Sequence, residues 1–465
     1  MYKFTKSVQL KEELCQGCIN CLKHCPTHAI RVHNNKATII DKFCIDCGRC
    51  IRYCPHHAKI AVYDPITVIG KYKYTIALPP PALFSQFHHL TNVDIVLNAF
   101  LDLGFDDVYE VGAAAELVSH ASREYLGENK GKGPIISSAC PSVVRLIRVK
   151  YPTLLPNLLP IKAPVEIAAE IARSRAMEKT GLPTEDIGVI FISPCPSKAS
   201  YIKFPLGIET SQIDHAVAIK DVYPLLLPLM NRKEEHLKPL SRTGRIGLGW
   251  GHSGGEIGGL LTDNYIASDG IVNISRVLDD LEDEKIHEVE FVELNACSGG
   301  CVGGVSNVEN AYAAVHKTQK LKKYQPVSKN RTEDNPELKD IFWADKIEYE
   351  PVFRLGDTFK ESFKMLQEVE DLTSQLPGLD CGSCGAPTCQ TLAEDIVRGD
   401  AQINSCIYLL RDNIYELAQK IHTLSLSPEL SADHENAIKI REHIQELTDE
   451  LAAFAIPDKN IPNKK

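Results

Sequence analysis

The sequence lacks the features of membrane-spanning and nucleic-acid-binding proteins. No stretch approaches the roughly 20 apolar residues that cross a bilayer, and the longest apolar passages have only the length of core strands. Lys and Arg number 51 against 61 Asp and Glu, for a net charge of −10, so no basic surplus is left to neutralise phosphates. The start, MYKFTKSVQLKEEL, has no apolar segment typical of a secretory signal. We therefore expect no membrane span, no nucleic-acid partner and no export.

The sequence also lacks any unpaired or isolated cysteine: every cysteine can be assigned to one of four sets of four. Sixteen cysteines in 465 residues without an export signal indicate metal ligation in a reducing cytoplasm rather than disulfides, so we expect a cytoplasmic protein. Iron–sulfur clusters are bound by thiolates, usually four per cluster, which predicts an electron-transfer protein with four cluster sites. The sets are Cys15, Cys18, Cys21 and Cys25; Cys44, Cys47, Cys50 and Cys54; Cys140, Cys195, Cys297 and Cys301; and Cys381, Cys384, Cys389 and Cys406.

Four segments differ in pattern, close to the three domains that the length predicts. Residues 1–70 hold two copies of one cysteine motif, and 71–340 alternate apolar runs with amphipathic stretches. Residues 341–410 hold the last cysteine set, and 411–465 form a tail. Strands alternating with helices in 71–340 predict a largely parallel α/β domain, so the fold class that we expect is multidomain α/β.

Three of the scattered cysteines, Cys140, Cys195 and Cys297, come at the ends of strand-like runs. Ligands bind at the carboxyl ends of strands in open α/β sheets, so these cysteines are candidates for one site. The expected strands lie within 68–78, 133–140, 186–195 and 289–297, and the clearest expected helix covers 164–179.

The tail is expected to form two amphipathic helices. Apolar residues recur at steps of four and three through 410–424 and again through 440–454, with Pro428 and Ser431 between them. Two interpretations remain open. The helices form a hairpin that packs on its own protein, or they provide a surface for a homodimer or a signalling partner.

Both N-terminal runs read C-x2-C-x2-C-x3-C-P, which resembles the bacterial ferredoxin run. The resemblance implies a ferredoxin-like α+β domain with two [4Fe–4S] clusters, in which the fourth cysteine of each run ligates the other cluster. Zinc, the alternative, more naturally uses CxxC pairs or Cys/His mixtures. The implied ligand sets are Cys15, Cys18, Cys21 and Cys54 for one cluster, and Cys44, Cys47, Cys50 and Cys25 for the other.

The scattered cysteines lie in ISSACPSVVRLI (136–147), ISPCPSKAS (192–200) and ELNACSGGCVGGV (293–305). Taken singly, each could be a buried structural thiol. Together, in order and spacing, the three segments resemble the signature loops of the [FeFe]-hydrogenase catalytic domain, which read roughly TSCCP, MPCxxKK and MACPGGCxxGGG. The resemblance covers about 270 residues, and its most specific piece is A-C-x-G-G-C.

The resemblance implies an H-cluster: a [4Fe–4S] cluster on Cys140, Cys195, Cys297 and Cys301, bridged by Cys301 to a di-iron subsite with CO, CN⁻ and dithiolate ligands, which carries the hard chemistry. Lys198 matches the lysine that hydrogen-bonds a cyanide ligand, a favourable pairing of an ammonium with an anion. The alternative is a solvated loop lysine. The implied reaction interconverts H₂ with protons and electrons. Its implied partners are an electron carrier such as ferredoxin and the hydrogenase maturation enzymes.

Several pocket positions depart from the family pattern. Where the family has a cysteine that passes protons, this chain has Ala139, which has no exchangeable proton. Ser193 and Asn295 replace methionines, Ala199 replaces a lysine and Ser298 replaces a proline. A positioned proton-shuttling group contributes about 10²–10⁴-fold, so we expect slow turnover. These departures and an extra cluster domain resemble the sensory branch of the family.

The sequence identifies no substitute proton path. His252 and Glu256 lie in the Gly-rich stretch GWGHSGGEIGG, which could approach a cofactor closely. The simpler interpretation is a turn with a surface histidine, because a lone histidine is rarely a relay without a named partner. Neither residue is therefore assigned to the site.

The last cysteine set reads C-x2-C-x4-C-x16-C and resembles the small iron–sulfur domain of corrinoid iron–sulfur proteins. The resemblance implies a third [4Fe–4S] cluster in a mainly helical domain, with a structural zinc site as the alternative.

The leading hypothesis is a low-turnover [FeFe]-hydrogenase that acts as a hydrogen or redox sensor. One alternative is a non-catalytic iron–sulfur scaffold or electron-transfer protein with only a [4Fe–4S] cluster at the middle site. Another is an electron-delivery protein for a corrinoid or carbon-monoxide system, which leaves 71–340 unexplained.

Overall fold

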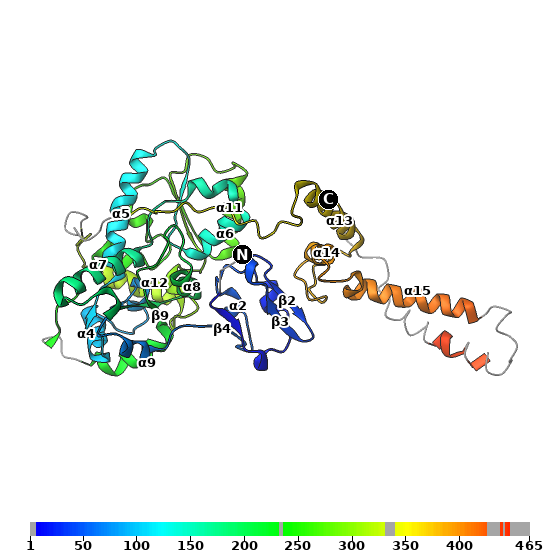
Figure 1. Ribbon diagram of the computed structural model, residues 1–465, viewed down its shortest axis with the longest axis horizontal. Coiled ribbons are helices and arrows are strands. Elements are labelled where there is room, and N and C mark those ends of the chain that lie inside the picture. The colour runs from blue at the N-terminus through cyan, green and yellow to red at the C-terminus, as the bar shows by residue number, and fades with distance from the viewer. Residues whose placement is uncertain (1–5, 232–235, 331–339, 426–437, 440–441, 447–465) are drawn as a thin grey trace. The chain divides into compact units, whose positions relative to one another are not determined.

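The computed structural model describes residues 6–231, 236–330, 340–425, 438–439 and 442–446. The chain divides into two compact units, the first comprising residues 1–30 and 35–353 and the second comprising 31–34 and 354–465. Figure 1 labels the elements of both units.

The N-terminal segment is built from short elements. They are β1 (Val8–Leu10), α1 (Asn20–Lys23), β2 (Ile30–His33), β3 (Lys36–Ile39), α2 (Arg49–Arg52) and β4 (Lys59–Ala61). Strands β1 and β4 pair antiparallel, with Leu10 opposite Lys59. Each helix holds the third cysteine of a run, Cys21 in α1 and Cys50 in α2. The internal repeat of the sequence is therefore also a repeat of structure.

A four-stranded parallel sheet organises the first half of the α/β region. Its strands are β5 (Tyr74–Leu78), β6 (Asp107–Val108), β8 (Ile187–Ser193) and β9 (His215–Ala218), in the order β6-β5-β8-β9. Strand β8 lies inside the sheet and is buried along its whole length. Its unbroken apolar run is typical of a strand that is covered on both faces.

Helices cover both faces of this sheet because side chains alternate along each strand. The helices are α4 (Asp94–Leu103), α5 (Val111–Glu128), α7 (Pro164–Thr180) and α9 (Ile219–Leu226). Val189 and Phe191 share one core with α5 and α7. Ile190 and Ile192 point the other way, into a second core with α4 and α9.

A three-stranded parallel sheet organises the second half, in the order β10-β11-β7. Its elements are β7 (Ile135–Ile136), β10 (Tyr265–Asp269) and β11 (Phe291–Asn295), with α6 (Pro141–Lys150) and α11 (Ile271–Glu282) packed on it. Val292 and Leu294 of β11 share a core with Ile147 of α6 and Ile274 of α11.

Shorter helices complete the described part of the first unit. They are α3 (Pro81–Phe84), α8 (Pro196–Lys203), α10 (Arg245–Gly249) and α12 (Ala311–Lys322). Helices α3 and α8 begin within three residues of the carboxyl ends of β5 and β8, so both start at the edge of the sheet where parallel α/β proteins bind ligands.

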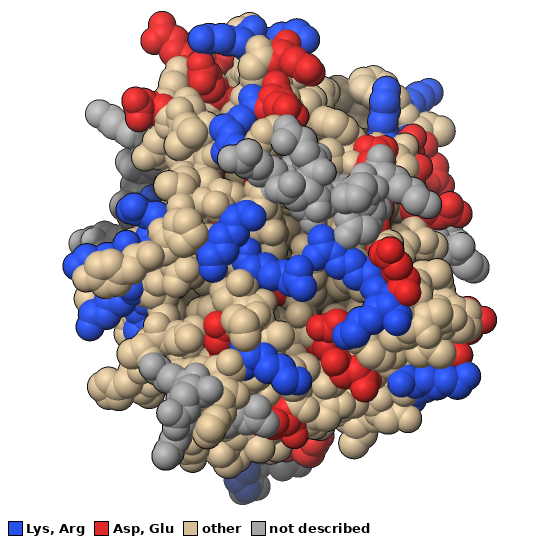
Figure 2. All heavy atoms as spheres, turned by 90° about the vertical axis from the view of Figure 1, so that its left-hand side faces the viewer, with Lys and Arg blue, Asp and Glu red and all other residues tan. Residues whose placement is uncertain are grey.

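One face of the molecule carries a band of basic side chains. Figure 2 shows the face that lies at the left in Figure 1, with Lys and Arg gathered across its middle and acidic side chains above and below.

The described residues of the second unit form three helices. They are α13 (Phe359–Gln375), α14 (Cys389–Val397) and α15 (Ile407–Ser425). Val369 of α13 shares a core with Leu392 and Ala393 of α14. The apolar seam of α15 is exposed, from 40% at Leu410 to 57% at Leu417. The first predicted tail helix is therefore confirmed, and most of the second falls outside the described residues.

The multidomain α/β fold class is confirmed. Strands β7, β8 and β11 lie inside three predicted stretches, and α7 reproduces the predicted helix with one added residue. In the fourth stretch, 68–78, the strand begins only at Tyr74, because residues 66–71 form a 3-10 helix. The four predicted segment boundaries stay predictions. No helix among the described residues has the length and apolar character of a membrane span.

Candidate functional site

The four scattered cysteines meet where the two parallel sheets end. Cys195 follows β8 and caps α8, whereas Cys140 follows β7 and caps α6. Cys297 follows β11, and Cys301 begins the next 3-10 turn. One cysteine thus follows a strand of the four-stranded sheet, and the others follow strands of the three-stranded sheet. The site therefore lies between two sheets. The sequence pattern predicted the strands but did not show that they belong to separate sheets.

The cysteines are close enough to influence one another. The pKa of Cys195 is raised to about 12, mainly by burial; Lys198 lowers it, and the nearby Cys301 and Cys140 add to the increase. Burial likewise raises the pKa of Cys297 and of Cys301. A buried thiol surrounded by other thiolates keeps its proton unless a metal displaces it.

Lys198 lies among these cysteines. Its Nζ donates a hydrogen bond to the carbonyl oxygen of Ala139, at 3.0 Å. Burial by itself lowers the pKa of Lys198, but the four surrounding thiolates outweigh burial, and its pKa lies above the ordinary value. Lys198 therefore lies half-buried in α8 with its amine bonded to the backbone, rather than extending into solvent from a loop.

A cavity of about 60 Å³ adjoins the cysteines. Three predicted pocket residues line it, Ala139, Lys198 and Asn295, together with Cys301. The fourth, Ser193, is not in the lining. Its hydroxyl donates to the carbonyl of Cys195 at 2.9 Å, which shapes the turn that carries this ligand.

Two buried carboxyl groups, Glu256 and Glu293, also line the cavity. Glu293 accepts hydrogen bonds from the amides of Gly254 and Ile257, at 2.8 and 3.0 Å, and from Asn295 Nδ2 at 2.9 Å. Glu256 accepts one from Ser137 Oγ at 2.5 Å.

The two carboxyl groups differ in how well they hold a proton. Burial first, and then the neighbouring Glu293, raise the pKa of Glu256 to about 8. Burial also raises the pKa of Glu293, but three hydrogen-bond donors favour its ionised form. Of the two carboxyl groups, Glu256 therefore holds a proton more readily than Glu293.

Sequence reasoning missed Glu293 and left out Glu256. Glu293 belongs to the expected strand, where alternation gave its face but no signal of its partners. The expectation of a surface histidine beside Glu256 was wrong: His252 is only 6% exposed. Its Nε2 lies 3.3 Å from Lys322 Nζ, on a neighbouring helix that local sequence could not identify.

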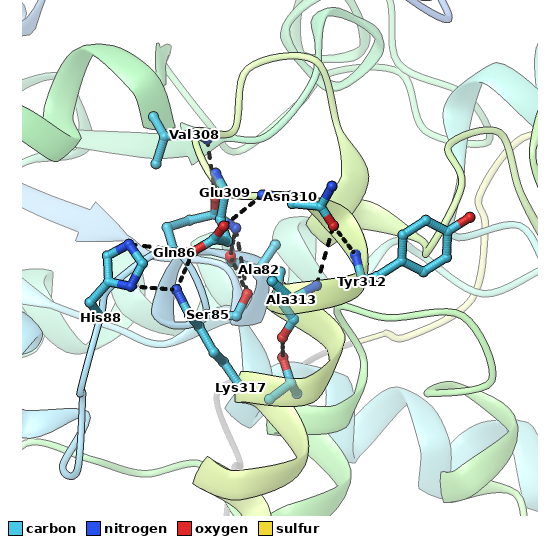
Figure 3. A network of polar contacts seen from close by, with 12 residues as sticks. Ala82, Ser85, Gln86, His88, Val308, Glu309, Asn310, Tyr312, Ala313 and Lys317 are labelled. Carbon is cyan, nitrogen blue, oxygen red and sulfur yellow. Dashed lines mark hydrogen bonds and ion pairs between the residues drawn. The ribbon is translucent and has the colours of Figure 1, made fainter.

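Gln86, also unpredicted, holds the segment after Cys301 against α3. Its side chain donates to the carbonyl of Ala82 at 2.8 Å and accepts from the amides of Val308 and Glu309, at 3.1 and 2.9 Å. Figure 3 shows the amide group between these two segments. Because Ala82 and Cys301 both line the cavity, Gln86 fixes one wall of it.

The glycines around Cys301 are required by close packing. Gly300 has φ +84°, and a Cβ there would lie 2.6 Å from the amide nitrogen of Ser253. A Cβ on Gly304 would lie 2.3 Å from the carbonyl oxygen of Pro194. The glycine frame thus lets the third loop approach the other two loops.

The ferredoxin-like cysteines interact across the two runs. The pKa of Cys21 is raised to about 11, mainly by burial; Lys59 lowers it, and the thiolates of Cys18, Cys54 and Cys15 contribute to the increase. Cys47, raised mainly by burial, is raised further by Cys25 and Cys50. The last cysteine of each run therefore lies with the first three of the other run.

This segment also packs directly on the scattered set. Arg52 donates a hydrogen bond to the carbonyl of Gly303, and Tyr63 shares a 2.5 Å hydrogen bond with Ser306. A Cβ on Gly48 would lie 2.8 Å from Val305. The loops that follow Cys301 are thus in van der Waals contact with the second cysteine run.

The C-terminal cysteines gather around the start of α14. Cys384, Cys389 and Cys406 share one apolar cluster. Burial raises the pKa of Cys384, and the thiolates of Cys381 and Cys406 raise it further. The amide of Cys389 donates to Asp380 at 2.7 Å, which orders the loop.

Each of the four cysteine sets supplies four thiols, the donor number that a cubane cluster uses, one for each of its iron atoms. In the described part of the chain, no three His, Cys, Asp or Glu side chains form a group that could hold a single metal ion.

Comparison with known families agrees with this chemistry. A family model described as the iron only hydrogenase large subunit, C-terminal domain, matches residues 73–255 and 252–305, about half of the chain. A 4Fe-4S dicluster domain matches 7–55, and an Fe-S cluster model matches 376–408. The three matches cover all four cysteine sets.

Individual relatives are distant. The chain is 25% identical over 206 residues to the NADP-reducing hydrogenase subunit HndD of Solidesulfovibrio fructosivorans, covering 41% of this chain and 31% of the relative. It is 41% identical over 51 residues to a component of the ion-translocating oxidoreductase complex of Rhodobacter capsulatus, covering 11% of this chain and 27% of that protein. The chain thus spans about three tenths of the curated relatives that it matches.

Among solved structures, a variant of the [FeFe]-hydrogenase HydA1 from Chlamydomonas reinhardtii aligns with a TM-score of 0.46 and 17% identity, over 59% of this chain and 91% of that one.

Proposed function

Because the chain belongs to the iron-only hydrogenase large-subunit family, we propose that it is an [FeFe]-hydrogenase-type oxidoreductase that interconverts H₂ with protons and electrons at an H-cluster, slowly, as a hydrogen or redox sensor. The observation that carries the proposal is the cavity bounded by Cys301, Lys198 and Ala139. It joins a thiolate, a fixed cation and an apolar wall in one buried space.

In this proposal Cys140, Cys195, Cys297 and Cys301 would hold the cubane part of the H-cluster, and Cys301, which lines the cavity, would be the cysteine next to the di-iron subsite. When bound, the subsite supplies the splitting and formation of H₂. Burial gives the free thiols high pKa values. Binding of the cluster iron would displace the thiol protons, so the cysteines would bind as thiolates.

The chain's own residues supply charge, shape and proton handling. Lys198, whose Nζ donates to the carbonyl of Ala139, would offer its ammonium to an anionic ligand of the cofactor. Ala139 cannot pass a proton, so we assign that step to Glu256, with Ser137 and Glu293 as its hydrogen-bond and electrostatic partners. The small cavity limits entry to water and small molecules.

We further propose two [4Fe–4S] clusters in the N-terminal segment, with ligands exchanged between the runs, and a third on Cys381, Cys384, Cys389 and Cys406. Contact of the N-terminal segment with the loop after Cys301 supports electron transfer between them. An external carrier such as ferredoxin, hydrogenase maturation enzymes and a signalling partner or second copy at the α15 seam complete the proposal.

Infrared spectroscopy of the anaerobic, maturase-treated protein tests the central claim. Bands of metal-bound CO and CN⁻ that shift when H₂ replaces inert gas are the expected result. If the protein is fully loaded with cubanes and the region stays blank, the middle site holds only a [4Fe–4S] cluster. The chain is then a scaffold or electron-transfer protein.

A further inference from the structure

The N-terminal repeat contains one departure that places a polar group in its core. A shift of 29 residues carries the first cysteine run onto the second, Ala29 onto Ala58 and Ile30 onto Lys59. Ile30 and Lys59 are each 2% exposed. Equivalent core positions are therefore filled by a hydrocarbon in one half and by an amine in the other.

The backbone around the two positions is the same. The amide of Ala29 donates to Cys25 Sγ at 3.2 Å, and the amide of Ala58 donates to Cys54 Sγ at 3.3 Å. Lys59 also lies in β4, fixed opposite Leu10 of β1. The position of Lys59 is thus set by the repeat and the strand pairing, so its side chain must enter the core.

The structure gives the amine of Lys59 no partner. Lys59 Nζ is screened from solvent and has no hydrogen-bond partner among the described residues. An ammonium without a partner in the interior is strongly unfavourable. The negative charge of bound iron–sulfur clusters would offset the free-energy cost of burying this ammonium.

The charged groups around Lys59 indicate where that counter-charge lies. Lys59 lies close enough to interact electrostatically with Cys21 in the first run and with Cys50 in the second. The pKa of the nearby cation Lys6 is lowered by burial and also by Lys59, and Lys6 pairs with Asp41.

Cys44 and Asp46 also act on Lys6. The carboxylate of Asp46 is occupied by the amides of Ser7 and Val8, at 2.7 and 2.9 Å. Lys59 itself acts on Cys21 of the first run and on Cys50 of the second.

We propose that Lys59 is a shared electrostatic partner of the two ferredoxin-like clusters and holds both of their reduction potentials high. The inference rests on the proposed binding of those clusters. A cubane on four thiolates is an anion, and each cluster gains one electron on reduction. A fixed cation in a low-dielectric core favours that gain. Because one ammonium faces both ligand sets, the two potentials move together.

The shared positive charge also makes reduction of the second cluster more favourable once the first cluster is reduced. When one cluster is reduced, its added negative charge opposes reduction of the other, and a cation that faces both offsets that repulsion. The segment then accepts two electrons over a narrow range of potential. Two electrons are what each H₂ oxidised in the proposed reaction releases.

Redox titration of the full chain, followed by electron paramagnetic resonance, tests the proposal. The neutral variants are Lys59→Met and Lys59→Ile, the second copying the residue of the other half. Lys59→Arg keeps the charge, and Lys42→Met removes an exposed lysine of the same segment. The magnetic coupling of the two clusters when both are reduced identifies their signals.

We expect the equilibrium constant for reduction of both clusters to fall at least tenfold in the neutral variants, a shift of about 59 mV per tenfold for a one-electron couple. Lys59→Arg and Lys42→Met should titrate like the parent. Unchanged potentials in Lys59→Met, or a shift confined to one cluster, would overturn the proposal.

Iron and sulfide content separates this inference from the proposed function. Absence of the two clusters from the parent protein refutes cluster binding itself. If the neutral variants lose the clusters while Lys59→Arg keeps them, the charge is needed for assembly, which supports the proposal. If Lys59→Arg loses them as well, Lys59 has a packing role and the proposal is wrong.

Discussion

Replacing Glu256 by glutamine should remove the proton-transfer group of the cavity. Glutamine keeps the size of the side chain and can still accept the hydrogen bond from Ser137, which is 2.5 Å long in the parent protein. It cannot take up or release a proton. A positioned acid or base contributes about 10²–10⁴-fold, so we expect a loss of that order in H₂ oxidation.

The pH dependence provides a second, independent magnitude. The pKa of Glu256 is about 8, raised by burial and by Glu293. H₂ oxidation needs the ionised form, which accepts a proton, so the rate should rise with pH up to about 8. At pH 6 about 1% of such a group is ionised, so the rate should fall about tenfold per pH unit below 8. Proton reduction needs the protonated form and should fall above pH 8.

The assay is dye-coupled H₂ oxidation across pH 5.5 to 9, with infrared spectra confirming equal cluster loading. Glu124→Gln is the matched control, because Glu124 is an exposed carboxylate on α5, 69% accessible. The reasoning is refuted if Glu256→Gln keeps the parent's rate of H₂ oxidation. It is also refuted if the rate of that variant still falls below pH 8 as the parent's does.

Three further substitutions test other parts of the site. Ala139→Cys restores an exchangeable proton beside Lys198 and should raise H₂ oxidation by up to about 10²–10⁴-fold; no gain in fully metallated protein contradicts the relay argument. Gln86→Leu leaves the amides of Val308 and Glu309 without their acceptor, at about 1–3 kcal/mol each, so amide hydrogen exchange after Cys301 should accelerate, whereas Gln86→Glu should preserve protection. Cys384→Ser should remove about four iron atoms per chain and leave the infrared bands unchanged; full iron retention would exclude a cluster there.

Much of the fold could be predicted because local patterns specify it. The apolar run that becomes β8 and the 3.6-residue periodicity of α7 are properties of contiguous residues. Cys140, Cys195 and Cys297 follow strands directly, so a rule about strand ends placed them at one edge. The partition of those strands into two sheets depends on pairing between distant segments, which no local pattern encodes.

The polar part of the site was less predictable for the same reason. Gln86 acts on amides more than 220 residues away, and Ser137 meets Glu256 across 119 residues. Burial of Lys59 was visible in part, because the repeat aligns it with Ile30. That alignment gives the position but not the absence of a partner, which requires the packed core.

Two departures from the family pattern form one physical unit in this cavity. Asn295 stands where the family has a methionine, and its Nδ2 donates to Glu293 Oε1 at 2.9 Å. A thioether is at best a weak acceptor and could not make this bond. By helping to hold Glu293 as an anion, Asn295 raises the proton affinity of Glu256, since two like charges in a buried site cannot both ionise freely. In the proposed proton path, the alanine at position 139 and the amide of Asn295 therefore affect the same step. The alanine removes a proton donor from the cavity. The amide of Asn295 favours the protonated form of Glu256 by stabilising the anion of Glu293.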